Sequence, residues 1–307
     1  MNNYIIGIDG GGTKTIGALY DEKGKEILRA EFGFSNFSID EKRATENIMK
    51  TIEALTKHRQ KDDQIMVMMG ISGATKIKNK HELIHQIEDQ FNVKAELVTD
   101  AMIALYSIDR KDHDHVIMAI GGTGSAVMML EDDQTTLLGG YGYLFGDEGS
   151  AYHLVIEAIK HIARSFDEGK PLSALQTKLC EHMYITTRDE LVSFVYSQTK
   201  TELARFAKII SECALASDEE AYLLLKHEAI GLAEQVMMAS RRFQTKRPIR
   251  IGLRGGFIQN APFVKSIFSA YIQEKLPLSD MEDHPNEAVL GAYRLAIKKL
   301  TSEVTSW

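Results

Sequence analysis

The residues with the clearest chemistry lie near the N-terminus, in the segment YIIGIDGGGTKT at residues 4–15. Its apolar first half is typical of a strand, so Asp9 would stand at a strand end, where it could hold Mg²⁺ through water. The three glycines at 10–12 permit a tight turn with positive φ and leave backbone N–H groups uncovered. Such groups can form a concave nest for an anion, and the following Thr-Lys-Thr adds hydroxyl donors and a positive charge.

Two interpretations of this segment are open from its residues alone. The P-loop pattern G-x-x-x-x-G-K-[ST] is not met, because Lys14 follows Thr13 rather than a glycine. The dinucleotide pattern G-x-G-x-x-G is not met either, because Thr15 stands in place of the third glycine. The segment is therefore either a phosphate site of another kind or a glycine-rich hairpin turn with a solvated aspartate.

A second segment repeats the order of the first one. The apolar residues His115–Ile120 run into Gly121-Gly-Thr-Gly-Ser125, and an apolar strand, a polar turn and a third strand follow. A repeated unit sets the architecture of a protein, so the chain is expected to form two similar domains whose glycine turns face a shared cleft. A further glycine pair, Gly255-Gly256, follows the apolar segment Ile249–Leu253. Two facing hairpins could clamp a polyphosphate, which is the main requirement of phosphoryl transfer.

The elements around these turns predict an α/β protein with a mixed sheet in each domain. Ser38–Glu41 reads as a capping box before a helix, and Ile65–Ile71 is typical of a strand buried on both faces. In the second half, Ser150 is expected to cap a helix. Two further capping boxes are expected at Thr187–Glu190 and at Ser217–Glu220, the latter before a long amphipathic helix.

Composition excludes several functional classes. The net charge of −7 gives no general attraction to nucleic acid or to an anionic membrane. The two cysteines, Cys180 and Cys213, form no C-x-x-C pair, so a zinc ribbon, a redox pair and a disulfide framework lack support. The N-terminus lacks a basic region and Asp9 interrupts its apolar run, so we expect no signal peptide, no membrane span and a cytoplasmic location.

The combination resembles the ASKHA superfamily of actin, sugar kinases and heat-shock chaperones, and within it the N-acetylglucosamine kinase and BadF/BadG/BcrA/BcrD ATPase family. The matching motifs cover the whole chain in the expected order. They are the phosphate motifs at 9–15 and 121–125, Ser35-Asn36, Ser72-Gly73, Thr99–Ala101, Gly139–Gly142 leading into Gly146–Ser150, and an adenosine region of Gly255–Phe257 with Glu287–Ala292.

The resemblance implies two ribonuclease-H-like (actin-like ATPase) domains, each a mixed sheet with helices, around a central cleft. The polar stretch Lys111–His115 places the boundary between domains 1–112 and 113–307, and the last helix is free to pack back on the first domain. Asp9 would position Mg²⁺ on the phosphates of ATP, through water. The residues that would bind the nucleotide and its phosphates are Gly11, Gly12, Thr13, Lys14, Thr15, Gly122, Thr123, Gly124, Gly255, Gly256 and Gly291. Those that would bind the sugar are Asn36, Ser72, Gly73, Asp100, Tyr141, Gly142 and Asp147.

Three of these polar residues also have a simpler interpretation. Asp100 follows an apolar strand and precedes a helix, so it is either a helix N-cap or, as the resemblance implies, the base that accepts the proton of a sugar 6-hydroxyl. Asp147 precedes a helix and could complement its dipole, whereas the resemblance places it on sugar hydroxyls. Asn36 is either a turn residue or a ligand of hydroxyl groups, since its amide both donates and accepts.

The resemblance implies an ATP- and Mg²⁺-dependent amino-sugar kinase that phosphorylates the 6-hydroxyl of N-acetylglucosamine or a close relative such as glucosamine or N-acetylmuramic acid, in a homodimer. Tyr141 and Phe37 stand where N-acetylglucosamine-binding relatives carry tryptophan and histidine. Both differences weaken the assignment of N-acetylglucosamine as the acceptor, but they leave the kinase chemistry intact. The alternative is a conformational ATPase that activates a partner enzyme, as in the BadF/BcrA branch, whose activators carry a cluster through cysteines.

Overall fold

The computed structural model describes residues 2–57, 59–60, 62–111, 114–282 and 284–304. The chain divides into two compact units, which are the described parts of 1–109 with 284–307, and of 110–283. Each unit holds one five-stranded mixed sheet flanked by helices, so the predicted α/β fold with a mixed sheet in each domain is confirmed.

The first unit is built on a sheet in the order β3-β2-β1-β4-β5. Strands β1, β2 and β3 form the antiparallel meander, and β4 and β5 extend it in parallel with β1. The strands are β1 (Asn3–Gly10), β2 (Lys14–Asp21), β3 (Glu26–Gly33), β4 (Gln64–Ile71) and β5 (Lys94–Thr99). The helices are α1 (Glu41–Thr56), the short 3₁₀ helix η1 (Ala74–Lys76), α2 (Lys80–Phe91), α3 (Asp100–Tyr106) and α12 (Ala288–Val304).

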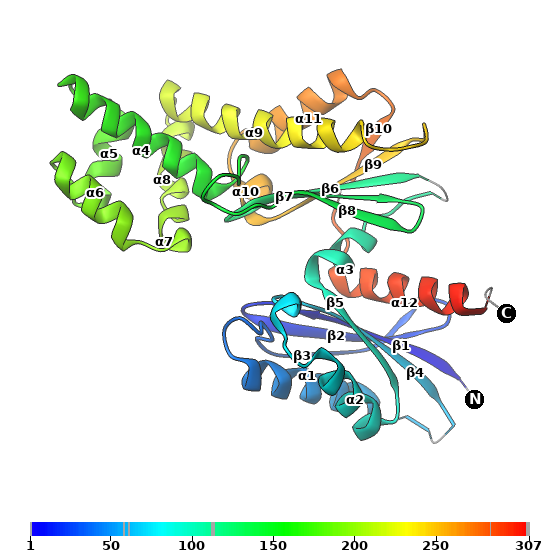
Figure 1. The fold of residues 1–307 in the computed structure, drawn as a ribbon. Helices are drawn as coiled ribbons and strands as arrows, with labels where there is room; N and C mark the ends of the chain where they lie inside the picture. Colours follow the sequence, from blue (N-terminus) through cyan, green and yellow to red (C-terminus); the bar gives the residue numbers. More distant parts are fainter. Residues whose placement is uncertain (1, 58, 61, 112–113, 283, 305–307) are drawn as a thin grey trace. The chain divides into compact units, whose positions relative to one another are not determined.

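Helices cover both faces of this sheet, with α1 and α2 on one face and α3 and α12 on the other (Figure 1). The alternation of side chains along a strand explains why. Ile6 and Ile8 of β1 belong to one apolar core with α1, whereas Ile5 belongs to a second core with Ile103 of α3 and Leu295 of α12. The C-terminal helix is therefore a part of the first unit, although the range 113–307 was predicted for the second domain.

The second unit repeats this plan with a sheet in the order β10-β9-β6-β7-β8. Its strands are β6 (His115–Gly121), β7 (Ser125–Glu131), β8 (Gln134–Gly139), β9 (Ile249–Arg254) and β10 (Ser279–Met281). Its helices are α4 (Ala151–Glu168), α5 (Ala174–Met183), α6 (Arg188–Ser197), α7 (Lys200–Ala204), α8 (Ala207–Leu215), α9 (Glu219–Ser240), α10 (Gly256–Asn260) and α11 (Val264–Lys275). Helices α4 to α8 gather beside one end of α9, and α9 and α11 lie along the sheet (Figure 1).

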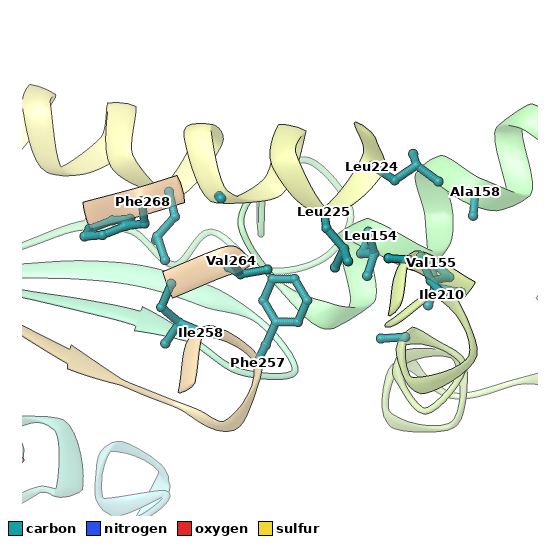
Figure 2. Close-up of a cluster of buried hydrophobic side chains, with 14 of the residues drawn as sticks. Leu154, Val155, Ala158, Ile210, Leu224, Leu225, Phe257, Ile258, Val264 and Phe268 are labelled. Atoms are coloured by element: carbon teal, nitrogen blue, oxygen red, sulfur yellow. The ribbon is translucent and has the colours of Figure 1, made fainter. Parts of the chain in front are cut away.

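One apolar core joins the sheet and the helices of this unit. Figure 2 shows a row of these buried side chains, which runs from Phe268 of α11 past Phe257 of α10 and Leu225 of α9 to Leu154 of α4 and Ile210 of α8. Full burial of such a side chain contributes about 1.5–3 kcal/mol, so the helical cluster is firmly attached to the sheet that carries the second glycine turn.

The helix starts agree only in part with the predicted caps. Ser150 and the box Thr187–Glu190 are confirmed as caps of α4 and α6. The boxes at Ser38 and Ser217 are wrong, because Asp40 and Asp218 are the N-caps of α1 and α9. Ser38 lies in a turn closed by its N–H donating to Asn36 Oδ1, and Ser217 has a left-handed φ of 67°, which leaves the capping position to the next aspartate.

Candidate active site

The turn between β1 and β2 carries the first glycine segment. The expectation of a positive-φ turn is wrong here, because Gly10, Gly11 and Gly12 are absent from the positive-φ glycines of the described chain. Gly10 is required by packing instead, since a Cβ atom there would lie 2.1 Å from Ser35 Oγ and 2.5 Å from Ile71 Cδ1. At Gly11 and Gly12 an added Cβ would meet nothing closer than 3.7 Å.

These glycines therefore separate into two kinds. The fold needs the small residue at 10, but neither packing nor backbone conformation needs one at 11 or 12. A residue without a side chain suits a bound phosphate at these positions, because a longer side chain would hold the anion away from the backbone. The open face of the turn is the first observation that favours a phosphate site over a structural hairpin.

A pair of glycine substitutions tests this distinction. Gly11→Ala should leave the thermal midpoint of unfolding within about 2 °C and lower kcat/KM for ATP about tenfold or more, since the new methyl group faces only the phosphate side. Gly10→Ala should lower stability by about 1–3 kcal/mol through overpacking. Thermal unfolding and ATP turnover measured on both variants decide the matter. Normal ATP kinetics in Gly11→Ala would remove this turn from the phosphate site.

The three polar residues after the glycines differ in how accessible their side chains are to a ligand. Thr13 is exposed, and Lys14 is half-exposed in an ion pair with Glu31 at 3.1 Å. Thr15 is completely buried and donates its hydroxyl hydrogen to the Gly33 carbonyl at 2.6 Å. Thr15 therefore fastens β2 to β3, and its hydroxyl faces the interior rather than the open side of the turn.

The parallel strands of the first unit bring several predicted residues to one edge. Because β1, β4 and β5 run in parallel, their carboxyl ends meet, and Asp9, Ser72 and Asp100 lie in or directly after these ends. Loops at this edge are the usual ligand-binding region of α/β proteins. Backbone bonds join them, since the Ser72 N–H donates to Gly10 O at 2.8 Å and the Ser35 N–H donates to Gly11 O at 3.0 Å.

Asp100 is the first residue of α3, and the structure excludes one of its two interpretations, the helix N-cap. Thr99 is the N-cap, because its hydroxyl oxygen accepts from the Met102 N–H at 3.3 Å. Asp100 is therefore not the cap of this helix. Its Oδ1 accepts from the Ala101 N–H at 2.9 Å, and the partly exposed side chain keeps its other oxygen available to a ligand.

Asp9 lies in an environment that disfavours its charge. Burial and, to a smaller extent, the negative charges of Asp100 and Glu287 raise the pKa of Asp9 to about 6, although Lys14 lowers it. A partly buried carboxylate among other carboxylates is suited to a cation, which would restore the charged form. No cluster of three or more His, Cys, Asp or Glu side chains able to hold a metal ion occurs in the described chain, so one carboxylate with water and phosphate oxygens fits Mg²⁺ best.

Three predicted sugar contacts lie together beside this edge. Asn36 donates through Nδ2 to Ser72 Oγ at 3.2 Å and accepts from the Ser38 N–H at 2.8 Å. Gly73 has a φ of 77°, and a Cβ there would lie 2.7 Å from Ser38 Oγ. The structure thus brings Asn36, Ser72 and Gly73 together in one unit with Asp100.

The second glycine turn joins β6 and β7 and lines a cavity. The turn is closed by the Gly122 N–H donating to Gly124 O at 2.9 Å, and Gly122 has open space where a Cβ would stand. Gly122 and Thr123 line a cavity of about 420 Å³, whose wall also includes Gly256. Such a volume is in the usual range for a small-molecule site.

Two positively charged side chains that line this cavity were not predicted from the sequence. Arg205 and Lys208 line it from the region of α7 and α8, where no element was predicted. Arg205 is the C-cap of α7 and Lys208 lies in α8, so no pattern within a single helix marks the pair in the sequence.

Gly256 lines this cavity, and Gly255 directly precedes it in the chain. Gly255 has a φ of 102°, and a Cβ there would lie 2.5 Å from Gly121 O, so only glycine fits between the two turns. Gly256 begins α10, and a Cβ there would meet nothing closer than Asn260 Nδ2 at 3.7 Å. Gly291 belongs to α12 of the first unit, where its Cβ would meet Ile103 O at 1.8 Å. The close packing of α12 on α3 accounts for that glycine.

Asp147 is not the N-cap of α4. Ser150 caps α4, whereas Asp147 is 4% exposed, accepts from the Ser125 N–H at 3.1 Å and forms an ion pair with Lys200 at 2.6 Å. Gly124 is small because a Cβ there would lie 2.5 Å from Lys200 Nζ. The predicted sugar ligand is therefore joined to the second glycine turn within its own unit.

Tyr141 and Gly142 lie in the loop after β8. Tyr141 is 70% exposed and stacks on Phe145, whose ring centroid is 5.8 Å away. Gly142 has a φ of 87°, a backbone conformation that favours glycine. The ring of Tyr141 is thus available to a ligand.

The two cysteines lie in the apolar core of the second unit. Cys180 of α5 is 4% exposed and Cys213 of α8 is 7% exposed. Burial raises the pKa of both thiols, which disfavours the thiolate that a metal cluster needs. In addition, no helix of the described chain is long and apolar enough to cross a membrane.

Known proteins resemble this chain over nearly its full length. It is 26% identical to the N-acetylmuramic acid/N-acetylglucosamine kinase of Clostridium acetobutylicum, covering 95% of this chain and 98% of the relative. It is 25% identical to the N-acetyl-D-glucosamine kinase of Dictyostelium discoideum, covering 95% and 97%. The fold matches the crystal structure of a proposed N-acetylglucosamine kinase from Chromobacterium violaceum with a TM-score of 0.69 at 22% identity, covering 94% and 97%. The BadF/BadG/BcrA/BcrD ATPase family matches residues 6–296, and the chain belongs to that family.

Proposed function

We propose that this protein is an ATP-dependent amino-sugar kinase, which transfers the γ-phosphoryl group of ATP to the 6-hydroxyl of N-acetylglucosamine or a close relative such as glucosamine or N-acetylmuramic acid. The observation that carries the proposal is the edge of the first sheet, where Asp100 is free of the capping role and lies in one unit with the open glycine turn. The names of the relatives support the same reaction.

The first unit supplies the groups that act on the acceptor. Asp100 accepts the proton of the attacking hydroxyl and orients that hydroxyl toward the phosphorus atom. Asn36 and Ser72 are joined by a hydrogen bond and present amide and hydroxyl groups that can pair with further sugar hydroxyls. The backbone N–H group of Gly12 stabilises negative charge on the transferred group, whereas the Gly11 N–H already donates to Lys14 O at 3.0 Å.

The donor nucleotide is assigned to groups of both units. Gly122, Thr123 and Gly256 line the cavity of the second unit, where backbone can lie close to phosphate and ribose. Arg205 and Lys208 add positive charge to the same cavity. Mg²⁺ on the β- and γ-phosphates would neutralise charge in the transition state, and Asp9 is the residue that would hold it.

The acceptor depends on residues outside the phosphate turns. An exposed aromatic ring such as Tyr141 can stack on a sugar face, and Asp147 is assigned to the sugar only through its contact with the second turn. The partners in this proposal are ATP and the amino sugar, in a cytoplasmic homodimer. A conformational ATPase is less well supported, because both cysteines lie in the apolar core rather than where a shared cluster would bind.

A coupled ADP-release assay with ATP and Mg²⁺ tests the function. The acceptors are N-acetylglucosamine, glucosamine, N-acetylmuramic acid, N-acetylmannosamine and glucose, each compared with a reaction that lacks sugar. We expect at least one amino sugar to raise the rate of ADP release about a hundredfold or more over the sugar-free rate, as befits chemistry with a positioned base. A rate that no sugar changes would remove the kinase function and favour the ATPase alternative.

A further inference from the structure

On one side, the second glycine turn is hydrogen-bonded to the segment Gly146–Ser150 and to the first residue of α4. The Ser125 N–H donates to Asp147 Oδ1 at 3.1 Å, and its hydroxyl donates to Glu148 O at 2.6 Å. On the other strand of the turn, the Ala151 N–H donates to Gly122 O at 2.9 Å. The position of the turn therefore follows the position of this segment.

The segment Gly146–Ser150 is held in turn by one face of α9. The Gly149 N–H donates to Glu228 Oε2 at 2.6 Å, and Gln235 Nε2 donates to Glu148 O at 2.8 Å. Between them, Leu232 packs so closely that a Cβ on Gly149 would lie 2.5 Å from Leu232 Cβ. The spacing 228, 232, 235 is the i, i+4, i+7 pattern of a single helix face. Helix α9 lies along the sheet of this unit (Figure 1).

Polar side chains at these two buried positions cost desolvation free energy, which only their hydrogen bonds offset. Glu228 is 1% exposed, and its other oxygen bonds to His153 Nδ1 of α4 at 2.8 Å, a contact that raises the pKa of His153. Gln235 is 9% exposed, and its Oε1 finds no hydrogen-bond partner in the described chain. A buried, partly unsatisfied polar group is destabilising, and hydrophobic replacements of buried ion pairs are often neutral or stabilising.

We propose that Glu228 and Gln235 are positioning residues of the phosphoryl-transfer site, which fix the second glycine turn through the segment Gly146–Ser150. This inference rests on the proposed kinase function for its effect on turnover. The contacts that join α9 to the segment Gly146–Ser150, and that segment to the glycine turn, all lie within the second unit. Catalytic donors must be held within a fraction of an ångström, and a 1 Å displacement can cost about a hundredfold in rate.

Kinetics of variants at 228 test the inference. Glu228→Leu should lower kcat about 10- to 100-fold and change KM for ATP less than threefold, because the turn still binds but is misplaced in the transition state. Glu228→Gln should stay within about threefold of wild type in kcat, because its Oε1 still accepts from Gly149 and its amide can donate to His153. Gln235→Met, which removes only the donor to Glu148, should reproduce the loss in milder form, about three- to tenfold.

Glu220 of α9 provides a matched control. It forms the same kind of contact with α4, to His161 Nδ1 at 2.8 Å, but it makes no hydrogen bond to the segment or the turn in the described chain. Glu220→Leu should therefore lower the thermal midpoint as Glu228→Leu does while kcat of the folded enzyme stays within threefold of wild type. Equal losses of kcat in both variants would show that kcat falls with the stability of the protein in general, and this result would overturn the proposal.

Hydrogen exchange separates this inference from the kinase function, because it needs neither ATP nor sugar. In Glu228→Leu the amides of Gly121–Ser125 should exchange at least tenfold faster than in wild type, together with those of Gly146–Ser150, whereas Glu220→Leu leaves both sets unchanged. Faster exchange in a protein that phosphorylates no sugar would reject the kinase function and retain the linkage. Unchanged exchange of the turn amides in Glu228→Leu would reject the linkage itself.

Discussion

Replacing Asp100 by asparagine lowers kcat with the best sugar acceptor about 10²- to 10⁴-fold, which is the usual contribution of a general base. The amide cannot accept the proton of the attacking hydroxyl, but its Oδ1 still accepts from the Ala101 N–H, as the aspartate does at 2.9 Å. Helix α3 therefore keeps its first turn. KM for ATP should change less than threefold, because no nucleotide contact is assigned to this side chain.

Thr99→Ala is the control for an effect on the helix alone. Thr99 is the actual N-cap of α3, so its loss should cost about 1 kcal/mol of stability and leave kcat within a few-fold of wild type. Both variants are measured by steady-state kinetics and thermal unfolding. A loss of less than tenfold in Asp100→Asn, or an equal loss in Thr99→Ala, would mean that Asp100 is not the base.

Asp9→Asn has the second largest effect, and it changes activity and stability in opposite directions. Activity with Mg²⁺ should fall about a hundredfold or more, because the residue assigned to the metal loses its charge.

Stability of the Asp9→Asn protein without ligands should rise relative to wild type. The folded pKa of about 6 lies above the ordinary value of 3.8, so the ionised carboxylate is disfavoured in the native protein at neutral pH. Removing that charge should add about 2–3 kcal/mol at pH 8, since one pKa unit is worth about 1.4 kcal/mol.

The pH dependence gives the sign of this effect. Between pH 3.8 and pH 6 the native protein binds the proton of Asp9 and the unfolded chain does not, so the wild type gains stability as the pH falls through 6. The advantage of Asp9→Asn is therefore full at pH 8 and decreases to about half at pH 5. Denaturant unfolding of both proteins at pH 8 and pH 5, without Mg²⁺, measures it. An asparagine variant less stable than wild type at pH 8 would contradict the buried, charge-repelled carboxylate.

The sequence was most informative where short-range chemistry decides the structure. The two strand–glycine–strand units appear as β1–β2 and β6–β7, and alternation of apolar residues explains why β1 is covered on both faces. The residues around Asn36 and Ser72 were expected in one site, and they meet because parallel strands end at one edge of the sheet.

The parts that could not be predicted depend on contacts between distant segments. Nothing in the glycine string shows that Gly10 is pressed against Ser35 or that Thr15 bonds to Gly33. The sequence assigned no role to Glu228 and Gln235, because their partners lie in a loop some eighty residues earlier in the chain. Whether the two glycine turns face one cleft stays a prediction, as do the residues assigned to the sugar and the nucleotide.

Analysis of the product by ³¹P NMR tests the central claim most directly. The enzyme is incubated with ATP, Mg²⁺ and N-acetylglucosamine, or with whichever amino sugar gives the highest rate of ADP release. We predict one new phosphomonoester signal, equal in amount to the ADP formed and coupled to the two protons on C6 of the sugar. Inorganic phosphate as the sole new product, or a phosphate coupled to the anomeric proton, would contradict a 6-hydroxyl kinase.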